Sequence, residues 1–281
     1  MRQIDVLHRG REKVIACFEV DGILVDPGPQ SCEETLLAGL AGVRPEALLL
    51  THIHFDHAGA AGALVRRWPN LPVYVHERGA PHMADPERLV ASAVRLYGGE
   101  EGLRETWGEV IPVPEENLHV LSGGETVLGF KVAYTPGHAS HHVCYLHSDG
   151  TLYAGDAVGV RIVPTRLVLP ASPPPDIDVE GWFRTFEEIE RRRPERLAMT
   201  HFGVADSPSE HLALAREELS RWSEWAEQGL DEGEWIEAAR GRLRDIAPDE
   251  ADTWERAAPL WQSYAGLERY WRKRREREAG A

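Results

Sequence analysis

The stretch that decides the fold of this chain, Thr51 to Gly59, reads Thr-His-Ile-His-Phe-Asp-His-Ala-Gly. Four side chains that can bind a metal, three imidazoles and one carboxylate, fall within six residues of it. An apolar run at 47–50 precedes it and small residues at 58–63 follow it, which predicts a buried strand, a loop and then a helix. The alternative is a chance cluster of surface histidines, but polar groups crowded at a buried strand end are costly unless they share a partner. Because imidazole and carboxylate suit zinc and similar divalent metals, the stretch predicts a metal site.

The composition is that of a soluble globular protein, with 281 residues of which 42% are hydrophobic and 27% charged. A formal net charge of −15 repels phosphate backbones, so we expect no nucleic-acid partner. Three cysteines are too few and too scattered for a disulfide framework. Residues 1–5 lack the apolar run of a signal peptide, and no stretch approaches the roughly 18 apolar residues of a membrane span. We therefore expect a cytoplasmic protein with no membrane partner and a small-molecule substrate.

Strands and helices are predicted to alternate along the chain up to about residue 205. Apolar runs at 14–20 and 23–25, joined by Asp21-Gly22, predict a hairpin. Ser31 and Glu34 predict a capping box at the start of a helix that ends near Gly42. Apolar or β-branched runs predict further strands at 72–76, 126–128, 130–134, 143–146, 151–154 and 196–199, and helices at 60–67 and 178–193.

The segment of residues 77–118 is long and irregular, so it is a candidate lid over a site. Asp85-Pro86 predicts the start of a helix in it, and Gly98-Gly99 predicts the end.

The chain beyond residue 205 is predicted to be helical. Ser207 to Glu210 combines a capping box with proline at the first helical position. A last helix is predicted from about Asp252, with a kink at Pro259. Seven of the nine tryptophans lie between Trp182 and Trp271, and they either pack on the core or form a homodimer interface or pocket wall.

The context of the opening stretch recurs at three other places. His138, Asp156 and His201 each follow a predicted strand, at the point where it stops at a small or turn residue. Seven ligands from four strand ends can converge at one edge of a sheet.

In these motifs the chain resembles the metallo-β-lactamase superfamily, over roughly residues 14 to 205. The residues that carry the resemblance are the 51–57 stretch, Thr135-Pro136-Gly137-His138, Gly155-Asp156 and Thr200-His201. It implies an α/β (α+β) fold, an αββα sandwich with a two-metal site at one edge. It also implies that residues 1–205 form the metal-binding domain and that 206–281 are a helical C-terminal extension packed on it.

The resemblance further implies how the ligands are divided between two divalent metals. One metal would be held by His52, His54 and His138, the second by Asp56, His57 and His201, and Asp156 would bridge them. Two cations about 3.5–4 Å apart can share a hydroxide at neutral pH, which attacks an electrophilic carbonyl or phosphorus. Asp56 can also accept the proton, which makes it the candidate catalytic residue. Nitrogen and oxygen ligands, with His54 where flavodiiron relatives carry Glu, favour zinc and leave iron and manganese open.

The motifs around the ligands leave the substrate open. His142 matches the second His of the Pro-Gly-His-Thr-x-Gly-His pattern of glyoxalase II-like members, but Ala139 and His141 replace its Thr and Gly, so we expect His142 to support the ligands from behind. The Gly-Asp-Thr-Leu-Phe run of glyoxalase II and a tyrosine of the acyl-homoserine lactonases are also replaced, since residues 155–159 read Gly-Asp-Ala-Val-Gly. The predicted activity is hydrolysis of an ester, lactone, thioester or phosphotriester. The alternative is a diiron redox or oxygen-binding protein on the same fold.

Overall fold

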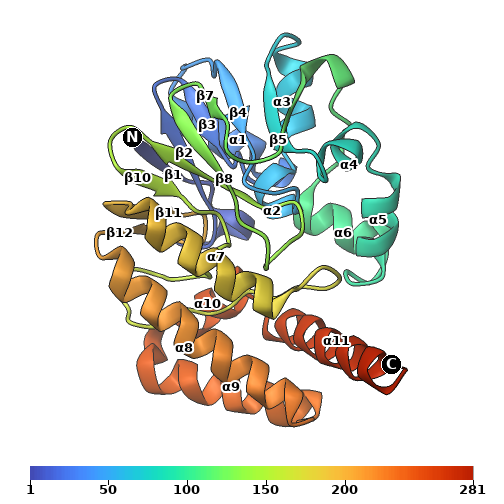
Figure 1. The fold of residues 1–281 in the computed structure, drawn as a ribbon. Helices are drawn as coiled ribbons and strands as arrows, with labels where there is room; N and C mark the ends of the chain where they lie inside the picture. The colour runs from blue at the N-terminus through green and yellow to red at the C-terminus, as the bar shows by residue number, and fades with distance from the viewer. Residues whose placement is uncertain (281) are drawn as a thin grey trace. The chain divides into compact units, whose positions relative to one another are not determined.

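The computed structural model describes residues 1–280, apart from the side chain of Glu250, and the chain divides into two compact units. Unit 1 comprises Met1–Tyr134 and His141–Ser148, and unit 2 comprises Thr135–Ser140 and the chain from Asp149 onward. Figure 1 colours the chain from its N-terminus in blue to its C-terminus in red. None of the helices in the described part of the chain is both long and apolar enough to cross a lipid bilayer.

Unit 1 contains a six-stranded sheet whose strands lie in chain order. The strands are β1 (Arg2–Asp5), β2 (Ala16–Val20), β3 (Ile23–Val25), β4 (Ala47–Leu49), β5 (Val73–His76) and β6 (Leu118–Leu121). The first three strands pair antiparallel, and β3 to β6 pair in parallel. The hairpin at Asp21-Gly22 is confirmed, and both residues have positive φ, 51° and 84°, as the tight turn between twisted strands requires. Strands β1 and β6 were not predicted.

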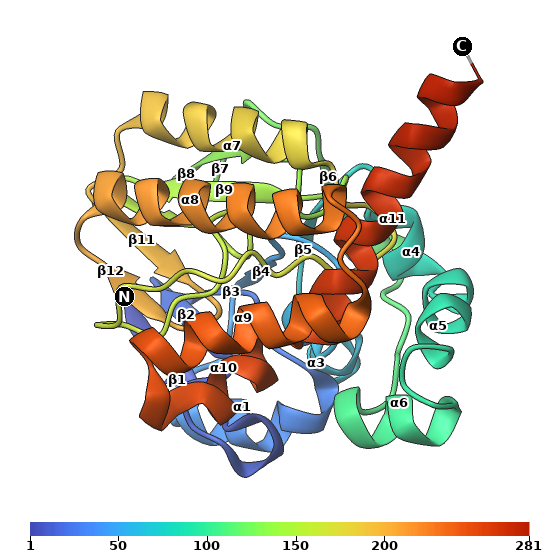
Figure 2. The same ribbon diagram turned by 90° about the horizontal axis from the view of Figure 1, so that it is seen from below.

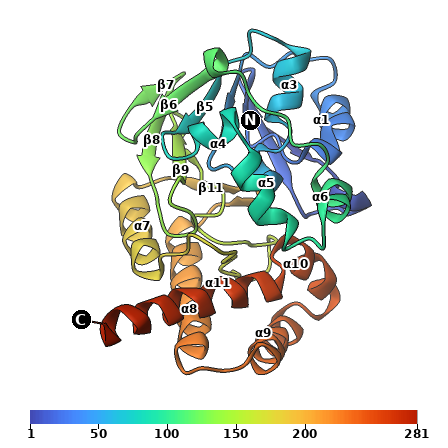
Figure 3. The ribbon, with the colours of Figure 1, turned by 90° about the vertical axis from the view of Figure 1, so that its right-hand side faces the viewer.

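Three more strands of unit 1 form an antiparallel ladder, β7 (Thr126–Val127), β8 (Phe130–Tyr134) and β9 (Val143–His147). The helices of unit 1 are α1 (Glu33–Leu40), α2 (Phe55–Ala58), α3 (Ala61–Arg67), α4 (Ala80–Ala84), α5 (Glu87–Val94) and α6 (Glu100–Trp107). Figure 3 shows α4, α5 and α6 following one another along the candidate lid.

The capping box predicted at Ser31 is wrong. Helix α1 begins at Glu33, and no side chain caps it. The Ser31 hydroxyl donates instead to the carbonyl of Thr106, 75 residues along the chain, at 2.9 Å. A tertiary hydrogen bond has therefore displaced the local one.

Among its described residues, unit 2 contains three strands and five α-helices. Strand β10 (Thr151–Tyr153) is parallel to β11 (Arg196–Met199), which is antiparallel to β12 (Gly203–Ala205). The helices are α7 (Val179–Arg192), α8 (Pro208–Glu227), α9 (Glu232–Ile246), α10 (Ala251–Ala257) and α11 (Leu260–Ala279). Figure 2 shows α7 and α8 side by side and α11 crossing α8 and α9, and each of these pairs is in contact.

The predicted helix boundaries of unit 2 hold in part. Helix α7 begins where a helix over 178–193 was predicted, with Asp178 capping it by accepting from the Gly181 amide, and the last helices break at Pro259 as predicted. Helix α8 begins with Pro208 as predicted, but Ser207 makes no capping hydrogen bond, so the second capping box is also wrong. Helix α9 lies in the part of the chain that was predicted to be helical, but its bounds were not predicted, although Asp231 and Glu234 cap it with a complete capping box.

The tryptophans of unit 2 include four that are fully buried, Trp182, Trp222, Trp235 and Trp254. The rings of Trp222 and Trp235 meet edge to face at 4.8 Å, and the Trp235 indole donates to the Trp222 carbonyl. These side chains therefore form the core of unit 2, as the first of the two interpretations of the tryptophans predicted. The boundary at 205/206 stays a prediction; α8 to α11 lie in the same unit as β10 to β12.

Candidate metal centre

In unit 1 the four predicted ligands lie together in the loop after β4 and the first turn of α2. The ring centroids of His52 and His57 are 4.0 Å apart, and His52 Nε2 lies 3.0 Å from His54 Nδ1. Asp56 Oδ2 is 3.9 Å from His57 Nε2. His52 and His57 are buried, whereas His54 and Asp56 are partly exposed. The apolar strand therefore ends in a compact group of three imidazoles and one carboxylate.

A buried carboxylate, that of Asp26, lies behind these ligands. Its Oδ2 accepts hydrogen bonds from Thr51 Oγ1 at 2.7 Å and from His57 Nδ1 at 2.8 Å, and its Oδ1 accepts from the Thr51 amide at 2.8 Å. Because a neutral imidazole carries one proton, an Nδ1–H that donates to Asp26 makes Nε2 the lone-pair nitrogen of His57. Asp26 follows strand β3 directly, as the predicted ligands follow their strands, but Asp21 follows β2 in the same way, so the strand-end context alone does not identify Asp26.

His142 and its neighbour His141, both in unit 1, lie beside the same ligands. The His142 ring stacks on His52 at 4.9 Å, and the His141 ring is 6.1 Å from His52 and 5.5 Å from His54. His142 is fully buried. Its supporting role stays a prediction.

In unit 2 the other three predicted ligands form a second group. His138 Nε2 lies 3.6 Å from Asp156 Oδ2, and His201 Nε2 lies 3.8 Å from Asp156 Oδ1. All three side chains are buried. Each oxygen of the Asp156 carboxylate is therefore beside a different imidazole, which is the arrangement that a bridging carboxylate needs.

His138 is held from several sides within unit 2. Its Nδ1 donates to the Ala171 carbonyl at 2.7 Å, so Nε2 is the lone-pair nitrogen here too. The Trp182 ring lies 5.7 Å from the His138 ring, and the Trp182 indole donates to the Ala157 carbonyl at 2.6 Å. Gly137 has φ 141° and packs so closely that a Cβ there would lie 2.4 Å from the Trp182 Cα. Only glycine fits at this position against Trp182 of helix α7.

The two groups fit divalent metals in donor type and spacing. Donor atoms that sit about 2.0–2.2 Å from one cation lie roughly 3–4 Å from each other. The Asp56–His57, His138–Asp156 and His201–Asp156 donor pairs are 3.6–3.9 Å apart. A set of imidazole nitrogens and carboxylate oxygens suits zinc and iron alike.

The candidate lid is attached to the metal motif through Phe55, the residue between His54 and Asp56. Phe55 packs in an apolar cluster with Ala93 of α5 and Leu103 of α6, together with the partly buried Leu89, Val90, Val94, Tyr97, Trp107 and Val110. The end of α6 is further tied to the residues before α1, since the Glu109 amide donates to Gln30 Oε1 at 2.7 Å. Helix α5 was predicted from the sequence, whereas α6 and this attachment were not.

The sequence model of the metallo-beta-lactamase superfamily matches residues 17–201, more than half of the chain. The hydroxyacylglutathione hydrolase of Xylella fastidiosa strain M12 is 34% identical over 136 residues, which cover 48% of this chain and 40% of that protein. A probable metallo-hydrolase of Bacillus subtilis, YqgX, is 31% identical over 48% of this chain and 60% of its own length. The chain thus spans less than two thirds of these curated relatives.

Solved structures show the same fold. An archaeal metallo-beta-lactamase superfamily protein, ST1585 from Sulfolobus tokodaii, superposes with a TM-score of 0.68 at 20% identity, over 95% of this chain and 97% of that one. A protein named TTHA1623, crystallised in a di-iron-bound form, superposes with a TM-score of 0.52 at 27% identity, over 71% of this chain and 91% of that one.

Proposed function

The chain belongs to the metallo-beta-lactamase superfamily and has its mixed α/β fold with a helical C-terminal part, and from that premise we propose that it is a hydrolase with a dinuclear metal centre. Zinc is the first candidate metal. The ligands would be divided as the family resemblance implies: His52, His54 and His138 on one metal, Asp56, His57 and His201 on the other, and Asp156 between them.

The observation that supports the proposal most is the preset tautomer of one ligand in each group. Asp26 accepts from Nδ1 of His57, and the Ala171 carbonyl accepts from Nδ1 of His138. Buried imidazoles that donate through one nitrogen and present a lone pair on the other are characteristic of metal ligands. Because these two imidazole rings are already oriented in the metal-free protein, metal binding costs less conformational entropy.

When bound, two such cations would supply a water that ionises at neutral pH and would polarise the bond to be cleaved. Asp56 would move the proton, because its side chain is 22% exposed and one of its oxygens lies 3.9 Å from His57 Nε2. The other oxygen can accept a proton from the attacking water. The segment of α4 to α6, attached through Phe55, would restrict the access of bulk water.

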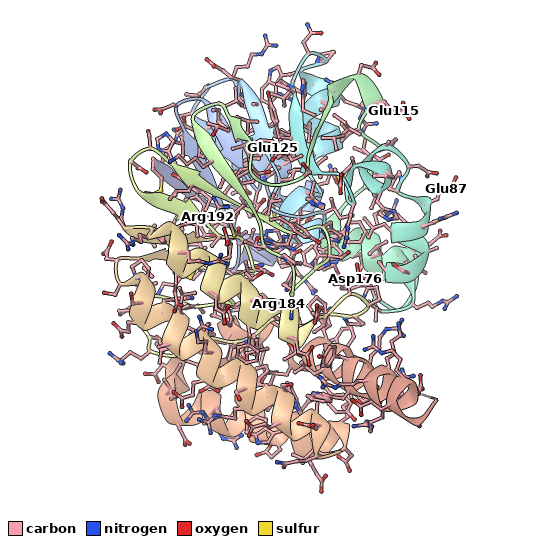
Figure 4. All side chains as sticks on the ribbon, viewed as in Figure 1. Glu87, Glu115, Glu125, Asp176, Arg184 and Arg192 are labelled. Atoms are coloured by element: carbon pink, nitrogen blue, oxygen red, sulfur yellow. The ribbon has the colours of Figure 1, made fainter. Side chains whose placement is uncertain are left out.

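A thioester is the first substrate class to test, because the Xylella relative is named as a hydrolase of hydroxyacylglutathione, which is a thioester. The replaced glyoxalase II residues at 157–159 keep lactones, other esters and phosphotriesters in the test. A nucleic acid is not expected. Exposed acidic side chains such as Glu87 and Glu115 point outward in Figure 4, on a chain of net charge −15.

The test is metal analysis of the purified protein followed by turnover on a thioester, a lactone, an ester and a phosphotriester. We expect two metals per chain and turnover of at least one substrate. Replacing a ligand, His57→Ala, should lower kcat/KM by at least about 100-fold, since ligand loss costs more than loss of a supporting residue. The matched control His119→Ala changes an exposed histidine of β6 and should leave both metal content and turnover unchanged. Stoichiometric zinc without turnover on any substrate, or full activity of His57→Ala, would overturn the proposal.

A diiron redox protein is the second candidate, favoured by the di-iron form in which the 27%-identical TTHA1623 was crystallised. Iron-loaded protein purified without oxygen should then develop visible absorption when oxygen is added. An unchanged spectrum would exclude this candidate.

A further inference from the structure

We propose that the C-terminal helix α11 positions the metal ligand His138 through the loop of residues 170–175. Gly266, which has no side chain, is the residue of α11 that lets this loop pack against the helix. The inference concerns the positioning of a ligand and rests on the metal-binding role proposed for His138. All the contacts involved lie within unit 2.

The first link joins His138 to the loop. The Ala171 carbonyl that accepts from His138 Nδ1 belongs to a peptide unit anchored on both sides. Upstream, Val160 and Leu169 exchange two backbone hydrogen bonds of 2.8 and 2.9 Å, and the Ala171 amide donates to Leu169. The carbonyl that sets the tautomer of His138 is thus part of a loop that is held by backbone hydrogen bonds.

The second link joins the loop to α11. Ser172 is fully buried, and its amide donates to Ser263 Oγ of α11, 91 residues along the chain, at 3.3 Å. One turn further along α11, a Cβ at Gly266 would lie 1.9 Å from the Ser172 carbonyl oxygen and 2.9 Å from its carbon. Residues three apart share a helix face, so Ser263 and Gly266 together form the surface of α11 on which the loop packs.

A glycine inside a helix destabilises the helix relative to alanine, so its presence needs a compensating contact. At Gly266 that contact is the loop backbone. Gly241 in α9 provides the contrast, because nothing lies within 4 Å of a Cβ placed there.

A side chain at position 266 would displace the peptide unit that holds the His138 ring. A methyl group at 266 would lie 1.9 Å from the Ser172 carbonyl oxygen, so that oxygen must move away by about 1.5 Å to reach ordinary contact distance, and Ala171 is the neighbour of Ser172. The Ala171 oxygen would then leave hydrogen-bond range of His138 Nδ1, because such bonds weaken beyond about 3.2 Å. The His138 ring would lose the acceptor that sets its tautomer and orientation.

The experiment compares Gly266→Ala with the matched control Gly241→Ala. In metal-free protein, ¹⁵N shifts of the imidazoles should report one tautomer of His138, with the proton on Nδ1, in wild type and Gly241→Ala, and a mixture in Gly266→Ala. Competition with a chelator should show zinc affinity about 10–100-fold weaker at one site in Gly266→Ala, the range found when a supporting hydrogen bond is lost. A folded Gly266→Ala with the wild-type tautomer and wild-type zinc affinity would overturn the inference.

A milder variant keeps the test decisive if Gly266→Ala fails to fold. Ser263→Ala removes only the hydroxyl that accepts from Ser172, and we expect a measurable tautomer mixture with up to about tenfold weaker zinc binding. Wild-type values for both readouts in Ser263→Ala would reject the role of α11. If the wild-type protein binds no metal, the proposed function fails, while the tautomer in metal-free protein still tests the positioning itself.

Discussion

At the scale of single residues, Asp26 should control metal binding without contacting the metals. In Asp26→Asn the side chain keeps its size, but an amide cannot accept all three hydrogen bonds that the carboxylate accepts from Thr51 and His57. We expect zinc affinity to fall by about 10–100-fold, and the free energy of unfolding to fall by roughly 1–3 kcal/mol, the cost of a buried donor left unmatched. Zinc titration and denaturant unfolding measure the two effects.

The control for this variant is Asp21→Asn, in the exposed turn before β3. An Asn-Gly pair suits that turn as well as Asp-Gly does, so neither affinity nor stability should change. Zinc binding by Asp26→Asn that matches that of Asp21→Asn would contradict the supporting role of Asp26. Sequence patterns alone could not separate the two aspartates, because Asp-Pro-Gly and Asp-Gly are both turn signatures.

At the scale of elements, helices α5 and α6 should depend on Phe55 for their order. The substitution Phe55→Leu removes part of the side chain that packs on Ala93 and Leu103. Amide exchange in α5 and α6 should therefore accelerate, while the parallel strands β3 to β6 stay protected. The matched control, Phe130→Leu at a buried position of β8, should act on the β7–β9 ladder instead. Unchanged exchange in both helices of Phe55→Leu would show that the metal motif does not hold this segment.

The elements that the sequence predicted poorly share a physical cause. Ser31 and Ser207 stand where capping residues are expected, yet neither caps its helix. In the first case the hydroxyl has a partner 75 residues away, which no local pattern reveals. Helix α6 was missed because its apolar face packs on Phe55 of the distant helix α2, and without that contact the segment looks irregular.

At the scale of the whole molecule, the buried His211 of α8 should make folding sensitive to acid. Burial lowers the pKa of His211 to about 4, and its Nε2 donates to the Val158 carbonyl at 2.8 Å. An unfolded chain takes up that proton near pH 6.5, so the stability contributed by neutral His211 is complete above pH 6.5 and is lost as the pH falls towards 4. The loss at pH 5 is about 2 kcal/mol by this linkage.

Urea unfolding at pH 7 and pH 5 measures the effect. The variant His211→Gln retains a donor for Val158 but does not titrate, so its stability should fall by about 2 kcal/mol less over this range than that of the wild type. The exposed His119→Gln should behave as the wild type does. Equal pH dependence in all three proteins would rule out a neutral, buried His211.

The sequence by itself determined the metal motif, most of the strands and the family, because the motif and the strands are runs of neighbouring residues and the family is recognised by four such short runs. Ligands at 52, 54, 56 and 57 need only a strand end to present them, and an apolar run needs only a sheet to bury it. The tertiary structure alone decided which groups support the ligands. Asp26 acts on His57 across 31 residues, Ala171 on His138 across 33, and Ser263 on Ser172 across 91. Contacts between such distant segments arise only when the chain folds, since hydrogen bonding and close packing depend on position in space and leave no periodic trace in the sequence.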